Sequence, residues 1–209
     1  MVQSLAISNL TLPELEEKQN LKLTDDPEFF AEWHEALPEL SDEEKRYLEQ
    51  VQQEYFDQTR MGQISEGLIK LIVVSPLLHL AGFYRYPFEV RLEEPVQIEV
   101  TEANELWRGR IDALVIKDFF WVLVVEAKNS VFGIDRAIPQ ALGYMLATPH
   151  PARLTYGLVT NGSSFAFIKL IQEPQPRYDV SDVMLLLPGR NVLLKVLQVM
   201  KQIGRMTGE

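Results

Sequence analysis

The 209-residue sequence contains no cysteine, only three histidines and no long apolar run. Without cysteine the chain cannot form disulfides, use a thiolate nucleophile or build a cysteine-ligated zinc site. His34, His79 and His150 are far apart in sequence and show no zinc-binding spacing. No run of about 18 apolar residues predicts a membrane span, and the N-terminal "MVQSLAISNL" lacks the pattern of a secretory signal. We therefore expect a cytoplasmic protein with no membrane partner.

An excess of basic charge is also absent, since the net charge is −10. The acidity is confined to residues 1–60, which hold fifteen acidic and five basic side chains, whereas residues 61–209 hold fifteen of each. A strongly acidic surface repels nucleic acid, but the neutral remainder leaves room for a local basic patch. This change in composition predicts two parts, an acidic helical extension over 1–60 and one domain over 61–209.

Hydrophobic patterning predicts the order of the elements. Ser41 and Glu44 form a capping box before a long helical pattern, and a second helical stretch covers residues 64–83. Other expected elements are a helix from Asp26–Pro27, a strand at 84–101, hairpins at 109–128 and 153–171 (the latter turning at Asn161–Gly162), and helices at 135–149 and 189–204. We therefore expect an α/β fold in which helices flank a mixed β-sheet.

Charged residues interrupt the most apolar part of the sequence. Asp112 lies in the first strand of the 109–128 hairpin, and Glu126 and Lys128 end the second strand after the run "FFWVLVV". If Asp112 is paired with Glu126, the turn centres on Phe119, where the apolar runs break. Since side chains two residues apart share one face of a strand, Asp112, Glu126 and Lys128 are then expected to converge.

Such a group of charges is suited to one kind of chemistry. Two neighbouring carboxylates raise each other's pKa and favour a cation between them. Mg²⁺ binds carboxylate and carbonyl oxygens while keeping waters for a substrate. An adjacent ammonium can orient the attacking water and offset phosphate charge. The combination predicts hydrolysis of a phosphodiester.

The Glu-x-Lys tripeptide by itself is uninformative. It also occurs at 16–18 and 43–45, both in charged segments with helical patterns. Only the copy at 126–128 ends a hydrophobic strand that follows a strand bearing an aspartate, Asp112. The plainer alternative is that these charges are solvated strand ends that form a weak surface ion pair.

The spacing of these residues resembles a known signature. Asp112, thirteen intervening residues and then Glu126-Ala127-Lys128 look like the motif of the PD-(D/E)XK nuclease superfamily. Ile111 stands where that motif often has proline.

Two further motifs agree with this resemblance. Glu66, in "ISEGLIKL", is placed like the acidic residue that a preceding core helix adds to the metal site in such nucleases. Gln140 and Tyr144, in "QALGY", match the Q-x-x-x-Y motif of RecB-type members, and their spacing puts both on one helical face. Over about residues 61–172 the order of motifs is most similar to the amino-terminal nuclease domain of type I restriction enzyme R subunits and its stand-alone relatives.

The resemblance implies a restriction-endonuclease-like sheet and Mg²⁺-dependent cleavage of DNA, with Mn²⁺ able to substitute. Lys128 would orient the attacking water or stabilise developing charge, while Gln140 and Tyr144 would support the site or position the substrate. The implied metal ligands are Glu66, Asp112, Glu126 and the carbonyl of Ala127, and the implied catalytic residues are Asp112, Glu126, Lys128, Gln140 and Tyr144.

Each of the supporting residues also has a plainer interpretation. Glu66 could be an exposed helix residue near a cap, and Gln140 and Tyr144 could pack at the edge of the core. Trp107, Arg108 and Arg110, which precede Asp112, could contact a phosphate backbone or simply form a strand edge.

The function has alternatives as well. The main one is a non-catalytic nucleic-acid-binding or assembly module that retains the nuclease fold, and the second is cleavage of RNA. Besides DNA, the expected partners are a second copy of the chain, forming a homodimer, or the other subunits of a restriction system.

Overall fold

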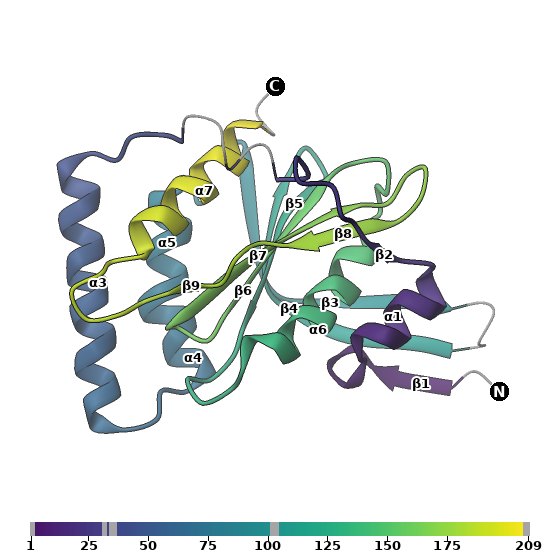
Figure 1. The fold of residues 1–209 in the computed structure, drawn as a ribbon, viewed down its shortest axis with the longest axis horizontal. Helices are drawn as coiled ribbons and strands as arrows, with labels where there is room; N and C mark the ends of the chain where they lie inside the picture. Colours follow the sequence, from purple (N-terminus) through teal and green to yellow (C-terminus); the bar gives the residue numbers. More distant parts are fainter. Residues whose placement is uncertain (1–2, 31–32, 34–36, 101–104, 207–209) are drawn as a thin grey trace.

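The computed structural model describes residues 3–30, 33, 37–100 and 105–206. Within these residues the chain forms one mixed nine-stranded β-sheet with helices on both faces (Figure 1). Along the sheet the strands follow the order β1-β4-β5-β6-β7-β8-β2, with β3 also paired to β4 and β9 to β7. The predicted α/β class with a helix-flanked mixed sheet is therefore confirmed.

From the second predicted helix onward, the chain follows the expected succession of helix, strands, helix, strands and helix. The strands are β1 (Gln3–Ala6), β2 (Lys22–Leu23), β3 (Phe88–Val100), β4 (Glu105–Lys117), β5 (Phe120–Ala127), β6 (Thr155–Thr160), β7 (Ser164–Ile171), β8 (Arg177–Val180) and β9 (Met184–Leu185). The helices are α1 (Leu12–Gln19), α3 (Asp42–Met61), α4 (Glu66–Ile69), the π-helical turn η2 (Lys70–Val74), α5 (Ser75–Leu80), α6 (Ala137–Leu146) and α7 (Leu193–Met206), with short 3₁₀ turns η1 (Ile7–Asn9) and η3 (Ile134–Arg136).

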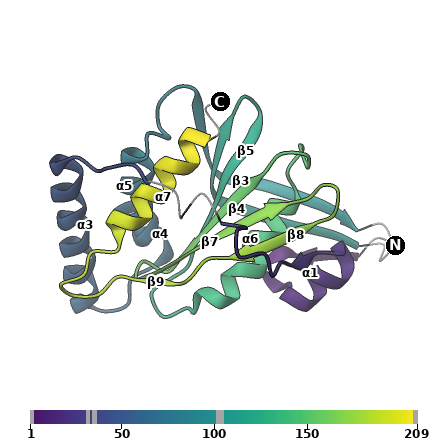
Figure 2. The same cartoon turned by 45° about the horizontal axis from the view of Figure 1, so that its top comes forward.

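The helices cover the sheet in two groups. Helices α3, α5 and α7 gather on one side and α1 and α6 on the other, and the groups stay apart when the molecule is turned (Figures 1 and 2). Each group buries its own hydrophobic core against the sheet, here called the α3-side core and the α6-side core. In β5, Val124 lies in the α6-side core and Val125 in the α3-side core, as the two-residue period of a strand requires.

Helix α3 begins where its capping box predicts. The Ser41 hydroxyl accepts a hydrogen bond from the Glu44 backbone N–H at 3.2 Å, and the Glu44 carboxylate accepts one from the Ser41 N–H at 2.8 Å. Leu48, Val51 and Tyr55 bury one stripe of the helix in the α3-side core. Neither α3 nor any other described helix is both long and apolar enough to cross a membrane.

The segment 1–60 was expected to be a helical extension, but it also adds two strands to the sheet. Strand β1 pairs in parallel with the first part of β4, and β2 pairs in parallel with β8. Ile7, Leu10 and Leu15 are buried in the α6-side core. This part of the chain thus supplies the strands at both ends of the sheet order and is not purely helical.

The helix expected to begin at Asp26–Pro27 falls only partly within the described residues. Residues 27–30 form a turn, and the Phe29 carbonyl accepts a hydrogen bond from the Lys169 ammonium of β7 at 2.6 Å. The remainder of that prediction, 31–32 and 34–36, lies outside the described residues. At its described start the segment is therefore a turn anchored on the sheet.

The β4–β5 hairpin has the predicted register near its charged end. The observed pairs are Ala113–Val125, Leu114–Val124 and Val115–Leu123. Between Val115 and Ile116 the register shifts, so that Asp118 and Phe119 form the turn with φ values of 49° and 71°. Two residues of positive φ are typical of a tight hairpin turn. The predicted position of the turn is confirmed, and the bulge beside it was not predicted.

Strands β3 and β4 change faces in their middle. Val90 packs against the α3-side core and Val96 lies in the α6-side core, although residues an even number apart share a face in a regular strand. The change occurs around Glu93, whose φ is 53°. A left-handed residue other than glycine costs on the order of 1 kcal/mol and is uncommon inside a strand. The register on either side of this point would place Glu93 opposite Asp112, so the irregularity lies beside the predicted site.

Candidate functional site

The charged end of the β4–β5 hairpin is buried. Asp112 is 6% exposed and Glu126 is 2% exposed. Lys128 follows β5 directly, and its backbone N–H donates to the Thr160 carbonyl of β6 at 2.8 Å. Two buried carboxylates are not solvated strand ends, so that alternative is wrong. Since burying a charge is costly without a partner, the partners of each group decide what the site can do.

Four side chains on the α6 side form a continuous hydrogen-bonded row. The Lys128 ammonium donates to Glu126 Oε1 at 2.6 Å and to Gln140 Oε1 at 2.8 Å. Gln140 Nε2 donates in turn to the Tyr144 hydroxyl at 2.7 Å, which also accepts the Arg110 backbone N–H at 3.3 Å. Helix α6 presents Gln140 and Tyr144 one turn apart, as their spacing predicts. The structure therefore brings together these four predicted site residues.

Gly109 allows Tyr144 to reach this row. A Cβ atom added at Gly109 would lie 2.5 Å from Tyr144 Cε1 and 2.9 Å from its hydroxyl, and the ring is buried on α6. We expect Gly109→Ala to lower the free energy of unfolding by roughly 1–3 kcal/mol and to displace Tyr144 from Gln140. Urea denaturation checks this, with Gly67→Ala as control because a Cβ there meets nothing within 4 Å. Equal losses in both variants would contradict the proposed contact.

Glu126 is the most perturbed carboxylate of the site. Its Oε2 atom is buried and has no hydrogen-bond partner. Burial, and after it the charge of Asp112, raise the pKa of Glu126 to about 8, although Lys128 opposes both effects. Buried polar atoms in native proteins are nearly always paired, and an exception calls for an explanation such as a bound ion. Glu126 therefore has an oxygen to offer to a cation.

Asp112 joins β4 to the end of β5 through its side chain. The β4–β5 ladder ends at the pair Ala113–Val125, and Asp112 Oδ2 then accepts the Ala127 backbone N–H at 2.7 Å in place of a backbone carbonyl. In a strand, the N–H and C=O of one residue point toward the same neighbour. The Ala127 carbonyl consequently faces the side of the strand on which Asp112 lies, as its predicted role requires.

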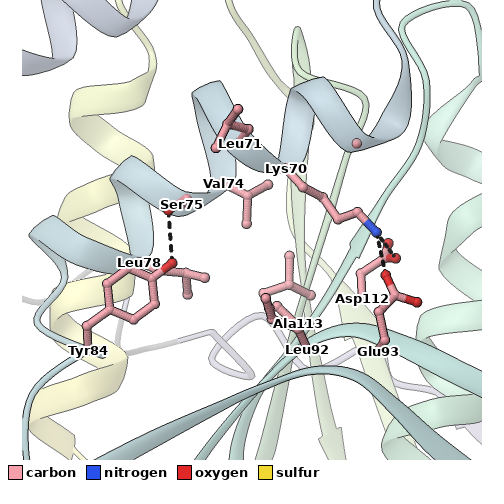
Figure 3. A pocket seen from close by; sticks show the side chains of 12 residues that line it. Lys70, Leu71, Val74, Ser75, Leu78, Tyr84, Leu92, Glu93, Asp112 and Ala113 are labelled. Atoms are coloured by element: carbon pink, nitrogen blue, oxygen red, sulfur yellow. Dashed lines mark hydrogen bonds and ion pairs between the residues drawn. The ribbon is translucent and has the colours of Figure 1, made fainter.

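The other Asp112 oxygen belongs to an acidic cluster, defined here as Glu66, Glu93 and Asp112 around the Lys70 ammonium. Figure 3 shows Lys70 reaching from the helix to Glu93 and Asp112, at 2.7 Å and 2.9 Å. Glu66 Oε1 lies 3.5 Å away, at the start of α4, with its side chain 41% exposed. Burial alone would lower the pKa of Lys70, but the bonds to Glu93 and Asp112 outweigh it and raise that pKa.

Lys70 and Glu93 were not predicted from the sequence. Lys70 follows Glu66 by four residues, a spacing that places both on one helical face and could have linked them. Glu93 gave no signal, because its position depends on the left-handed backbone within β3.

A pocket of about 280 Å³ opens beside Lys70, between the helical stretch 66–80 and strands β3 and β4. Glu93 and Asp112 lie at one end of it, and a hydrogen bond from the Tyr84 hydroxyl to Ser75 lies at the other (Figure 3). The walls between these ends are mainly apolar and include Leu71, Val74, Leu78, Leu92, Ala113 and Val125. The pocket gives a ligand access to one edge of the acidic cluster.

The net charge of the site is one that a divalent cation would balance. Fully ionised, the site carries a net charge of −2, from Glu66, Glu93, Asp112 and Glu126 against Lys70 and Lys128. In the described part of the chain, no three Asp, Glu or His side chains stand close enough together to hold a metal ion. The oxygens of Asp112 and Glu126 fit Mg²⁺ by type, and Glu126 Oε2 is open. Glu66 would first have to leave Lys70.

The residues before Asp112 differ from one another in exposure. Trp107 is fully buried, and its indole N–H donates to Glu105 at 2.9 Å, so of its two interpretations the contact with a phosphate backbone is wrong. Arg108 and Arg110 are exposed. Only these two remain candidates for such a contact.

Comparison with known proteins identifies no family. A scan against models of protein families finds no match to the chain, and a search of curated proteins finds none either. What the protein does must therefore be inferred from its own side chains.

Proposed function

We propose that the protein is a metal-dependent nuclease of the restriction-endonuclease-like fold that hydrolyses DNA phosphodiester bonds. The topology supports this: β3, β4 and β5 are antiparallel, α6 crosses over to β6 parallel to β5, and β7 returns antiparallel. One observation carries the proposal. The buried Glu126 carboxylate has one oxygen without a hydrogen-bond partner, and the charge of Asp112 acts on this carboxylate, so a metal ion between the two residues would relieve their repulsion.

Asp112 and Glu126 are the side chains that would hold Mg²⁺, with Mn²⁺ as a substitute. The Ala127 carbonyl would add a third oxygen, and Glu66 is near enough for its charge to act on Glu126. When bound, the ion would offset negative charge on the phosphate and make water a stronger nucleophile. Oxygen donors of this type are those that Mg²⁺ prefers.

Lys128 would act on the reacting atoms directly. An ammonium group has three donors, and Glu126 and Gln140 accept two of them. The remaining donor can orient the attacking water or stabilise charge that develops on the phosphate. Gln140 is itself held by Tyr144 at 2.7 Å. These two residues position Lys128 and are not required to touch the substrate.

One observation favours the second candidate function. Lys70 already neutralises Asp112, as a cation would. In a non-catalytic binding or assembly module, this ion pair would stand in place of the metal and nucleic acid would be bound without being cut. Under either function, the proposed partners are DNA and either a second copy of the chain or the other subunits of a restriction system.

Removing the metal tests the nuclease proposal. Purified protein is incubated with plasmid and with linear DNA in Mg²⁺ or Mn²⁺, in parallel with a chelator and with labelled RNA. We expect DNA cleavage that the chelator abolishes, because Asp112 and Glu126 need a cation to act on phosphate. DNA binding without cleavage in any metal would favour the non-catalytic module, and cleavage confined to RNA would replace the substrate.

A further inference from the structure

The acidic cluster contains a cation that the nuclease proposal does not use. We propose that Lys70 is a displaceable internal counter-ion that sets the affinity of the site for its metal, with Glu93 as its second anchor. This inference rests on the proposed function, since it concerns the ion that the function requires. Lys70 is a positioning residue in this account and does not touch the substrate.

Lys70 lies between a buried and an exposed carboxylate. Its ammonium is 2.9 Å from Asp112 Oδ1 and 2.7 Å from Glu93 Oε1. The Asp112 side chain is 8% exposed, the Lys70 side chain 25% and the Glu93 side chain 51%. The ammonium can therefore move outward toward Glu93 and keep one ionic partner while it leaves the other.

The oxygen that Lys70 occupies is the one a metal would need. Asp112 Oδ2 is already engaged by the Ala127 N–H at 2.7 Å, which leaves Oδ1 as the available ligand. A monovalent ammonium and a divalent ion at this oxygen would repel each other and exclude one another by size. Without metal, Lys70 keeps the buried Asp112 charge paired. With metal, it must withdraw.

Lys70 and its anchor Glu93 both lie on irregular backbone. Lys70 opens the π-helical turn η2, and Glu93 has a φ of 53° inside β3. Single π turns and left-handed residues are costly and recur at functional sites. An ion pair at partly exposed positions contributes little to stability. The Lys70–Glu93 pair would therefore not offset the cost of both irregularities if it served stability alone. The two irregularities meet at Lys70.

The test is titration calorimetry with Mn²⁺, together with thermal unfolding with and without Mn²⁺. Lys70→Met removes the competing charge, so we expect the Kd for Mn²⁺ to fall about tenfold. Its metal-free Tm should fall as well and recover with Mn²⁺. Lys70→Arg keeps the charge and should not bind more tightly. Glu93→Gln removes the second anchor, so Lys70 stays on Asp112 and the Kd should rise severalfold.

Two matched variants separate this effect from general loss of charge. Lys18→Met removes a lysine of similar exposure, 24%, that is paired with Glu105 at 2.8 Å. Glu94→Gln removes the carboxylate next in sequence to Glu93, and Glu94 pairs with Arg91. Neither should alter the Kd for Mn²⁺.

The outcomes distinguish the two proposals. Wild-type binding of Mn²⁺ with unchanged or weaker binding in folded Lys70→Met would overturn the role of Lys70 alone. Should Lys70→Met fail to fold, unchanged or tighter binding in Glu93→Gln would overturn it equally. No Mn²⁺ binding by the wild type or any variant would contradict the proposed function itself.

Discussion

Replacing Glu126 by glutamine is expected to reduce metal-dependent cleavage strongly while making the metal-free protein more stable at alkaline pH. The amide keeps an oxygen to accept the bond from Lys128, so the packing of the row is preserved. It removes the negative charge that a metal needs, and we expect cleavage to fall on the order of 10²–10³-fold. Initial rates on plasmid DNA at saturating Mg²⁺ measure this loss.

The stability effect follows from the raised pKa of Glu126, about 8 in the folded protein against an ordinary value of 4.5. An acid whose pKa is raised by folding stabilises the fold below its unfolded pKa, and this contribution is lost as the pH rises through the folded pKa. Between about pH 5 and pH 9 the wild type should therefore lose on the order of 4 kcal/mol from this group.

Urea unfolding in chelator at several pH values checks that prediction. Subtracting the Glu126→Gln curve from the wild-type curve isolates this group, since the other titratable groups are common to both proteins. We expect the variant to gain on the wild type steadily from about pH 5 upward. A difference that stays constant across this range would show that Glu126 is charged and satisfied without a ligand.

Replacing Lys128 by alanine is the second change with a large expected effect. Cleavage should fall on the order of 10²–10³-fold, because the donor that holds water or developing charge is removed. Stability should fall too, since Glu126 loses its only ionic partner at 2.6 Å among the described residues and Gln140 Oε1 loses its donor. Mn²⁺ should still bind, since both carboxylates remain.

The chain provides its own control for this variant. Lys45 belongs to a second Glu-x-Lys tripeptide, but it lies on α3, is 49% exposed and pairs with Asp42 only at 3.4 Å. Lys45→Ala should cleave like the wild type and change the free energy of unfolding by less than about 0.5 kcal/mol. Equal activity in Lys45→Ala and Lys128→Ala would mean that Lys128 has no role in cleavage.

Much of the scaffold could be predicted because local rules and packing agree. The capping box at Ser41 predicts the start of α3, and the pairing of Asp112 with Glu126 predicts the register of the β4–β5 hairpin near its charged end. Gln140 and Tyr144 were expected on one helical face, and they are joined by a hydrogen bond there. In each case a short-range pattern determines the geometry, so the sequence is sufficient.

The remainder depends on contacts that no local pattern encodes. Strand β1 has four residues and β2 has two, and only pairing with distant strands makes them strands. Glu93 resembles any polar strand residue until the change of faces in β3 turns it toward Lys70. The predicted group of carboxylates was also simpler than the observed arrangement of charges. The carboxylates are shared between two lysines, because Glu66 and Asp112 pair with Lys70 and Glu126 pairs with Lys128.

Titration of Mn²⁺ into the wild-type protein and into Glu126→Gln tests the central claim most directly, because it asks whether a cation binds between Asp112 and Glu126. We predict one Mn²⁺ per chain in the wild type, and at least a tenfold weaker Kd in the variant because half of the carboxylate pair has lost its charge. Equal Kd values in the two proteins, or no binding by the wild type, would contradict the account.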